Sequence, residues 1–480
     1  MADMEAYLSN LQPDLLNMTR LFQLPDRVWE EMELKARAEE GLFRARVRGL
    51  GLEREKCAEI PGDTGDERLT ELHRRRCARR LCRQTLYELC REATGMHPPW
   101  GSLTGIRPTR LLYEGLESGL SLKAAAERVR RDFDVTAEKA ELLREVVETQ
   151  SSLLPPDMGQ ADVYIGIPFC VTRCSYCSFS SGEIGDGHLV EPYLDALEAE
   201  MREGAELLRE SGLTLRSLYM GGGTPTSLTA KQLDRVLKCM RRCFPGRVET
   251  TVEAGRPDTL EREKFRVIRA WGADRISINP QTMNDETLRV IGRKHTAEDV
   301  RQAYAMARET GMDHINMDLI AGLPGEDTDM FAHTLREAEA LRPESLTVHT
   351  LAIKRSSRMQ QTGEGLPEGG MVSRMVDMAR DCARFMGMRP YYLYRQKSMA
   401  GNLENVGYAL PGHACQYNVD IMEEHTHILA FGAGGISKRV FPEEGHIERA
   451  PNVSNIEIYI EKWREMAGRK RDLFLPRENE

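Results

Sequence analysis

Three cysteines lie close together in the segment Cys170-Val-Thr-Arg-Cys174-Ser-Tyr-Cys177, with the spacing C-x3-C-x2-C. Thiolates this near to one another on a loop can each bind a different iron of a cubane cluster. Three protein ligands would leave the fourth iron of a [4Fe–4S] cluster available to a substrate or cosubstrate. The spacing therefore predicts an iron–sulfur centre held by Cys170, Cys174 and Cys177.

A zinc site and incidental core thiols are the two other interpretations of these cysteines. Structural zinc usually takes four ligands, with a second pair farther along the chain. The sequence offers no clear second pair, and three cysteines in one short loop are unusual for a core. The pattern favours the cluster over both alternatives.

Composition limits the class of protein. The chain has 480 residues, which is long for one hydrophobic core and predicts two or three domains. Its net charge of −9 argues against a broad nucleic-acid-binding surface. The odd number of cysteines, 11, favours reduced thiols over a disulfide scaffold. We find no signal peptide and no apolar run that could cross a membrane, and we expect a cytoplasmic protein.

The elements that must position the cysteines follow a regular alternation of apolar runs and amphipathic stretches. Helices are expected at 190–210, 229–243 and 328–341, between candidate strands. The candidate strands cover 163–169, 215–220, 249–253, 275–279, 315–320 and 345–353. Strands that alternate with helices indicate βαβ units and a parallel sheet, hence an α/β fold. Six units predict a partial (β/α)6 barrel with a lateral opening, and a doubly wound open sheet is the alternative.

Changes in this pattern predict three domains. Residues 1–158 form an N-terminal α+β domain that is mostly helical, 159–363 form the partial barrel, and 364–480 form a C-terminal region that completes the substrate cavity. The first domain carries a strand near 41–48 and an Arg-rich helix over 66–93. We interpret the arginines as a solvated helix face rather than a surface for nucleic acid or an acidic partner. The C-terminal region contains candidate strands at 391–396 and 428–437, the second ending in a glycine turn.

Polar and glycine residues follow the predicted strands where their carboxyl ends meet, which is where α/β folds place functional groups. Gly221-Gly-Gly-Thr-Pro-Thr226 follows the second strand, and its backbone can approach a small ligand closely. The charged or amide side chains along the same edge are Glu253, Gln281, Arg293 and Asp318. Together they offer carboxylates to an ammonium or ribose and a cation to a carboxylate.

These motifs carry a family resemblance that covers nearly the whole chain. The cysteine motif followed by Gly-Gly-Gly-Thr-Pro resembles the radical S-adenosylmethionine superfamily. Within it, Ile291-Gly-Arg-Lys-His295 and Asn316-Met-Asp-Leu-Ile-Ala-Gly-Leu-Pro324 are similar to the oxygen-independent coproporphyrinogen III oxidase (dehydrogenase) group. Gly101-Ser-Leu-Thr-Gly-Ile-Arg-Pro108 and Glu253-Ala-Gly-Arg-Pro257 resemble the HemZ branch of that group.

The resemblance implies two cofactors, a [4Fe–4S] cluster and S-adenosylmethionine, together with an electron donor such as flavodoxin or ferredoxin. It implies oxidative decarboxylation of two propionates of coproporphyrinogen III to vinyl groups, giving protoporphyrinogen IX in anaerobic haem biosynthesis. The residues that match the family's S-adenosylmethionine contacts are Tyr164, Tyr176, Gly222, Gly223, Thr224, Glu253, Gln281, Arg293, Asp318, Ala352 and Ile436.

Some positions depart from the well-established coproporphyrinogen enzymes. Those enzymes carry a fourth cysteine where this chain has Ser178-Phe179, and a histidine where it has Gly166. Relatives thought to be haem chaperones share the first of these departures. A haem-binding chaperone and a radical enzyme acting on another tetrapyrrole therefore remain alternatives.

A substrate with four carboxylates needs cations that the cosubstrate does not use. Basic side chains near the expected mouth of the cavity are His349, Lys354, Arg355, Arg358, Arg395 and Lys397. The sequence alone does not distinguish a substrate-binding role for them from a solvated rim.

Overall fold

The computed structural model describes residues 7–8, 11–105, 107–154, 157–178, 181–354, 357–362, 365–396, 399–442 and 446–475. The chain divides into two compact units. The first comprises Met1–Arg144 with Gly401–Leu403, and the second comprises Glu145–Ala400 with Glu404–Glu480.

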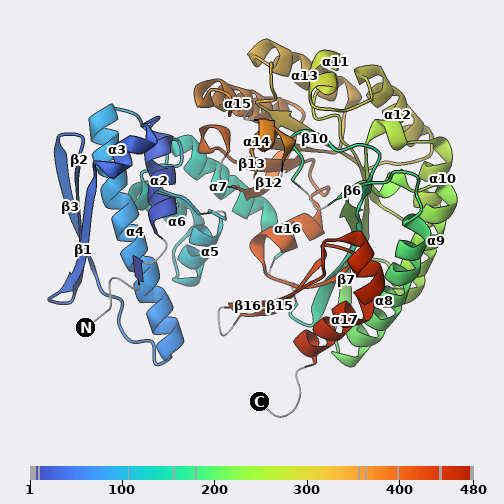
Figure 1. Ribbon diagram of the computed structural model, residues 1–480, viewed down its shortest axis with the longest axis horizontal. Helices are drawn as coiled ribbons and strands as arrows, with labels where there is room; N and C mark the ends of the chain where they lie inside the picture. Colours follow the sequence, from blue (N-terminus) through green and yellow to red (C-terminus); the bar gives the residue numbers. More distant parts are fainter. Residues whose placement is uncertain are drawn as a thin grey trace. The chain divides into compact units, whose positions relative to one another are not determined.

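The first unit is built on a three-stranded antiparallel sheet and one long helix (Figure 1). The strands are β1 (Glu33–Glu39), β2 (Leu42–Gly49) and β3 (Leu52–Glu59), and the helix is α4 (Glu67–Thr94). In β2 the side chains of Phe43, Ala45 and Val47 alternate with exposed or half-buried residues and are fully buried. This period of two gives the strand one face for the core, which it shares with α4. The predicted strand and Arg-rich helix are both confirmed.

Shorter helices complete the N-terminal half of the chain. Side-chain hydrogen bonds cap the starts of two of these helices and satisfy amide groups that a helix leaves without partners. For example, the Ser121 side chain accepts from Ala124 N at the start of α6. The helices are α2 (Gln12–Leu21), α3 (Asp26–Glu30), α5 (Arg110–Glu117), α6 (Leu122–Phe133) and α7 (Ala137–Gln150).

The second unit contains a sheet of 11 strands in the order β12-β13-β11-β10-β9-β8-β7-β4-β14-β15-β16. Six consecutive parallel strands follow the chain order without a reversal, which is the topology of a partial barrel and not of a doubly wound sheet. They are β4 (Gln160–Ile167), β7 (Thr214–Gly222), β8 (Glu249–Gly255), β9 (Arg275–Ile278), β10 (Ile315–Ala321) and β11 (Ser345–Thr350). The predicted open (β/α)6 barrel is therefore confirmed.

Helices cover the outside of this barrel and appear as an arc in Figure 1. Their amphipathic pattern buries one face against the strands. In α9, for example, Leu233, Val236, Leu237 and Met240 are buried, and a capping box between Thr229 and Gln232 fixes the start. The helices of this layer are α8 (Val190–Glu210), α9 (Ala230–Cys243), α10 (Arg262–Ala270), α11 (Asp285–Val290), α12 (Ala297–Glu309) and α13 (Thr328–Leu341).

The C-terminal strands extend the barrel sheet at both edges. β14 (His427–Phe431) pairs in parallel with β4, and β13 (Asn405–Ala409) pairs antiparallel with β11. One strand was predicted over 428–437, with a glycine turn at its end. The structure instead has β14, a turn with positive φ at Gly432 and Gly434, and a second strand. The remaining elements are α14 (Arg358–Thr362), α15 (Gly369–Phe385), β12 (Arg389–Tyr394), β15 (Ile436–Phe441), β16 (His446–Pro451) and α17 (Ile456–Phe474).

The short helix α16 (Gln416–Glu423) lies within the curve of the barrel sheet (Figure 1). Tyr417 stacks on Tyr219 of β7 with 4.4 Å between ring centroids. Asp420 accepts from Arg216 near the start of the same strand, at 2.7 Å. The helix thus fills the barrel interior toward the amino ends of the strands. Within the described ranges, no helix is both long and apolar enough to span a bilayer.

Candidate active site

The loop after β4 carries the three cysteines and is held from two sides. It begins with β5 (Phe169–Cys170), which pairs with β6 (Gly182–Glu183). Farther along, Ser175 N donates to Ile291 O at 3.0 Å, and Met359 N donates to Ser175 O at 3.1 Å. These backbone bonds fix the loop at the carboxyl end of the barrel strands, as the sequence predicted.

Each of the first two thiols has a polar neighbour. Cys170 Sγ lies 3.5 Å from Thr224 Oγ1, and Cys174 Sγ lies 3.9 Å from Arg256 Nη1. Arg256 also donates to Thr172 O at 2.8 Å and pairs with Asp258 at 2.8 Å. A guanidinium at this position can donate a hydrogen bond to the sulfur of Cys174. Arg256 belongs to the motif Glu253-Ala-Gly-Arg-Pro257, and no spacing rule in the sequence connects it with Cys174.

Among the residues that the structure describes, no group of three or more Cys, His, Asp and Glu side chains is placed to hold a single metal ion.

The glycines at the end of β7 and directly after it lie where a side chain would collide with neighbouring atoms. A Cβ atom on Gly221 would lie 2.7 Å from Glu253 Cδ. A Cβ atom on Gly223 would lie 2.7 Å from Phe169 O and 3.0 Å from Cys170 Sγ. Gly222 has a φ of +115°, which L-residues with a side chain rarely adopt. The segment therefore requires glycine to bring its backbone beside the cysteine loop.

Glu253 of β8 lies next to this glycine run. Its carboxylate accepts from Tyr219 Oη at 2.6 Å and from Gly222 N at 3.3 Å. Burial raises the pKa of Glu253 to about 7, and Asp318 adds to the rise, while the two hydrogen bonds oppose it. A carboxylate that is costly to ionise in the free protein is well suited to accept from an ammonium or hydroxyl group.

Arg293 and Asn279 present polar atoms to the same region. Arg293 Nη1 donates to Asn279 O at 2.6 Å, and its Nη2 donates to Tyr176 Oη at 3.2 Å. Arg293 Nε and Asn279 Oδ1 are buried and have no hydrogen-bond partner within the described parts of the chain. Buried polar groups are nearly always hydrogen-bonded, so these atoms indicate a ligand that completes the site.

Gln281 and Asp318 are joined through the backbone. Gln281 N donates to Asp318 O at 2.9 Å, and Gln281 has a φ of +68°. This unfavourable conformation for a residue with a side chain is typical of functional sites. Asp318 accepts from Asn316 at 2.7 Å, and its carboxylate lies 3.7 Å from His349 Nε2.

The other predicted contacts are distributed around this end of the sheet. Tyr164 of β4 stacks at 6.3 Å from Tyr219 and at 6.1 Å from Tyr417. Ala352 forms an isolated bridge with Met399, and Ile436 begins β15 with 45% of its surface exposed. The structure thus brings together the groups around Cys170, Cys174 and Glu253, whereas Ile436 is among the exposed large hydrophobic residues.

The predicted substrate cations differ in their surroundings. Arg395 is only 2% exposed, and burial lowers its pKa to about 10 despite the nearby Glu404, so it is not part of a solvated rim. Arg358 lies 3.2 Å from Glu183, and Lys354 is exposed. Arg355 and Lys397, like Phe179, lie outside the described residues.

Comparison with known proteins agrees with this site. The model of the radical SAM superfamily matches residues 164–338. The oxygen-independent coproporphyrinogen-III oxidase-like protein HemZ of Bacillus subtilis is 44% identical over 380 residues, which cover 77% of this chain and 76% of that protein. The haem chaperone HemW of Bacillus subtilis is 30% identical over 307 residues, covering 62% of this chain and 74% of the chaperone.

Among solved structures, the coproporphyrinogen III oxidase HemN of Escherichia coli, a radical SAM enzyme, matches with a TM-score of 0.51 and 25% identity. The match covers 69% of this chain and 74% of that one. The chain belongs to the radical SAM superfamily and, within it, to the family of the coproporphyrinogen III oxidase-like protein HemZ. This superfamily uses a [4Fe–4S] cluster and S-adenosylmethionine, and the three cysteines, the glycine cradle and the buried polar atoms fit both.

Proposed function

We propose that the protein converts two propionates of coproporphyrinogen III to vinyl groups and so produces protoporphyrinogen IX. The observation that carries this proposal is the likeness to the Escherichia coli oxygen-independent coproporphyrinogen III oxidase, in sequence as well as in fold. The two sequences are 34% identical over 192 residues, which cover 40% of this chain and 41% of that enzyme. We further propose that the protein acts in the cytoplasm with a flavodoxin or ferredoxin as donor.

In this proposal each group at the carboxyl end of the barrel has a role. Cys170, Cys174 and Cys177 would each hold one iron, and Arg256 would donate a hydrogen bond to the sulfur of Cys174. The contacts to S-adenosylmethionine would come from Tyr164, Tyr176, Gly222, Gly223, Thr224, Glu253, Gln281, Arg293, Asp318, Ala352 and Ile436.

When bound, the cluster and S-adenosylmethionine supply a 5′-deoxyadenosyl radical, and the protein's task is to orient and shield the reactants. Glu253 would accept a hydrogen bond from the ligand, and Arg293 Nε would donate one. The stacked rings of Tyr164, Tyr219 and Tyr417 would keep water from the barrel interior.

The overall change balances as two identical oxidations. Each propionate loses one hydrogen atom from its β-carbon, then carbon dioxide and one electron, and a vinyl group remains. The hydrogen atom would pass to the radical derived from S-adenosylmethionine, whose formation takes one electron from the donor, and the electron released with carbon dioxide would pass to a one-electron acceptor. Each turnover at one propionate therefore consumes one S-adenosylmethionine.

The test is anaerobic turnover of the reconstituted, reduced protein with S-adenosylmethionine and coproporphyrinogen III. Mass spectrometry should show 5′-deoxyadenosine and a porphyrin product that has lost two carboxyl groups. Both should be missing with Cys174→Ala and present with the exposed-cysteine control Cys57→Ala. Deoxyadenosine without decarboxylation would retain the radical chemistry and reject this substrate.

A second candidate is a haem chaperone, and Ser178 favours it. This residue follows the last cysteine directly and belongs to the departure that the chain shares with relatives thought to be chaperones. The HemW relatives at 27–30% identity support the same candidate. Stable haem binding without deoxyadenosine formation, in the same anaerobic preparation, would favour the chaperone over the oxidase.

A further inference from the structure

The N-terminal unit contains a cavity of about 980 Å³ with a strongly basic lining. Its walls are α4, the segment before α5, and α5 itself. Its arginines are Arg75, Arg76, Arg79, Arg80 and Arg83 on the helix and Arg107 and Arg110 near α5. Its acidic lining residues are Asp14, Glu59 and Glu114, so positive charge exceeds negative charge.

The helix period brings these arginines to one side of α4. Arg76, Arg79, Arg80 and Arg83 are spaced by three, one and three residues, which places them along one face of a helix. Buried residues of the same helix, including Leu81, Leu86 and Leu89, belong to the core of the unit. The arginine face is therefore separate from the face that stabilises the fold.

Two of these arginines lie near the outer limit of ion-pair distance from the same carboxylate. Arg79 Nη2 lies 3.7 Å and Arg83 Nη2 lies 4.0 Å from Asp14 Oδ2. Arg83 Nη1 donates to Thr104 Oγ1 at 2.8 Å. Arg83 Nε is buried without a hydrogen-bond partner among the residues described. Burial lowers the pKa of Arg83, Asp14 opposes this change, and Arg79 reinforces it.

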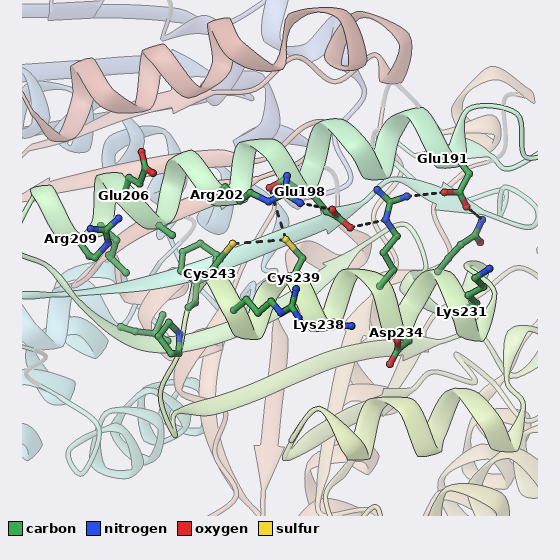
Figure 2. Close-up of a pocket in the computed structure, with 18 of the residues that line it drawn as sticks. Glu191, Glu198, Arg202, Glu206, Arg209, Lys231, Asp234, Lys238, Cys239 and Cys243 are labelled. Atoms are coloured by element: carbon green, nitrogen blue, oxygen red, sulfur yellow. Dashed lines mark hydrogen bonds and ion pairs between the residues drawn. The ribbon is translucent and has the colours of Figure 1, made fainter.

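A second cavity, of about 1380 Å³ between α8 and α9, provides a comparison within the same protein (Figure 2). There Arg235 bonds to Glu191 at 2.8 Å, to Asp195 at 2.5 Å and to Glu198 at 2.7 Å. Glu198 also accepts from Arg202 at 2.7 Å. In that groove the protein's own carboxylates pair these two arginines, so no external anion is needed to neutralise them.

We propose that the α4 cavity binds a small molecule that carries two or more phosphate or carboxylate groups. The planar guanidinium group pairs in a bidentate manner with either kind of oxyanion. The cavity volume matches the range typical of small-molecule sites, about 300–1,000 Å³. This site goes beyond the proposed radical chemistry and does not depend on it.

Nucleic acid is a poorer fit to the same surface. Among the described lining residues, Phe133 is the one that carries a benzene ring, and Arg80 lies over it at 5.5 Å. Bases bound by single-strand-binding proteins stack on exposed aromatic rings, whereas the other ring of the described lining, the imidazole of His73, is half-buried. A compact polyanion therefore fits this lining better than single-stranded nucleic acid does.

The test is isothermal titration of the full-length reconstituted protein with tripolyphosphate and, separately, with benzenehexacarboxylate. We expect saturable binding of at least one probe at low salt, weakened as salt is added. The double variant Arg79→Gln/Arg83→Gln should bind about 10-fold more weakly or worse, because two charge-assisted bonds are lost. The control Arg68→Gln/Arg289→Gln removes two exposed charges outside the cavity and should bind like the wild type.

A lysine pair, Arg79→Lys/Arg83→Lys, separates a folding defect from a binding defect because it keeps the charge and loses the planar fork. It should bind with an affinity between those of the wild type and the glutamine pair. If only tripolyphosphate binds saturably, the site binds phosphate groups. If only benzenehexacarboxylate binds saturably, the site binds carboxylate groups. Non-saturable binding of both probes, or equal weakening by the control pair, would overturn the proposal. The titration contains no S-adenosylmethionine or reductant, so its failure would leave the proposed function untouched.

Discussion

The two ends of the barrel differ in whether their buried polar groups have hydrogen-bond partners. Toward the amino ends of the strands, Asp162 accepts from Ser217 at 2.6 Å and from Thr426 at 2.7 Å, and Arg216 pairs with Asp420 at 2.7 Å. At the carboxyl ends, Arg293 Nε and Asn279 Oδ1 are buried and have no partner in the described ranges.

Within one sheet, the amino end therefore contributes to stability and the carboxyl end to ligand binding. At the amino end, Asp420 of α16 pairs with Arg216, and Asp162 is held by Ser217 and Thr426. The carboxyl end has the glycine run Gly221–Gly223, which we call the glycine cradle, and buried polar atoms that no described residue satisfies. Barrel folds generally place function at the carboxyl end, and here the hydrogen-bond partners show the division directly.

The largest effect is expected from Cys174→Ala at the carboxyl end. Loss of a cluster ligand should exceed the roughly 10–100-fold cost of losing an outer partner of a metal site. Bound iron and 5′-deoxyadenosine formation should fall accordingly, while Cys57→Ala leaves both unchanged. Full iron content in the Cys174 variant would contradict the ligand assignment.

At the amino end, Arg216→Ala should instead reduce stability. It leaves Asp420 buried without its ion-pair partner, which typically costs about 3–5 kcal/mol. Urea unfolding followed by circular dichroism measures the loss, and the exposed Arg289→Ala serves as control. A change below about 1 kcal/mol would show that the two ends do not differ in the way we infer.

The pH dependence of stability should report Glu253. Its folded pKa of about 7 lies above the usual 4.5, so ionisation destabilises the folded state. The free energy of unfolding should therefore fall as pH rises from about 4.5 to about 7, by up to about 3 kcal/mol. Glu253→Gln should remove this part of the slope, whereas the exposed Glu309→Gln should keep it. Parallel wild-type and Glu253→Gln curves would reject the raised pKa.

The smallest effect is expected from Gly223→Ala, which inserts one methyl group beside Phe169 O and Cys170 Sγ. Overpacking of this kind costs about 1–3 kcal/mol, so affinity for S-adenosylmethionine should fall about 10-fold. Gly468→Ala, where a Cβ atom would have no neighbour within 4 Å, is the matched control. Equal affinities of the two variants for S-adenosylmethionine in equilibrium dialysis would show that Gly223 does not contribute to its binding.

The sequence predicted most of what depends on local patterns. Cysteine spacing indicated the cluster loop, and the alternation of strands and helices indicated the partial barrel, because both signals occur within short segments. The single strand expected over 428–437 was wrong in its extent, since the glycine turn after Phe431 ends one strand and begins another. The division into three functional domains and the roles of the site residues remain predictions.

Tertiary structure alone decided the contacts between distant residues. Arg256 and Cys174 are 82 positions apart, and Asp420 and Arg216 are 204 apart, so no spacing rule connects them. Arg395 looked like a cavity-mouth cation in the sequence and is buried beside Glu404. Hydrophobic periodicity reports which face of an element is buried, whereas the neighbour across that face depends on how the whole chain packs.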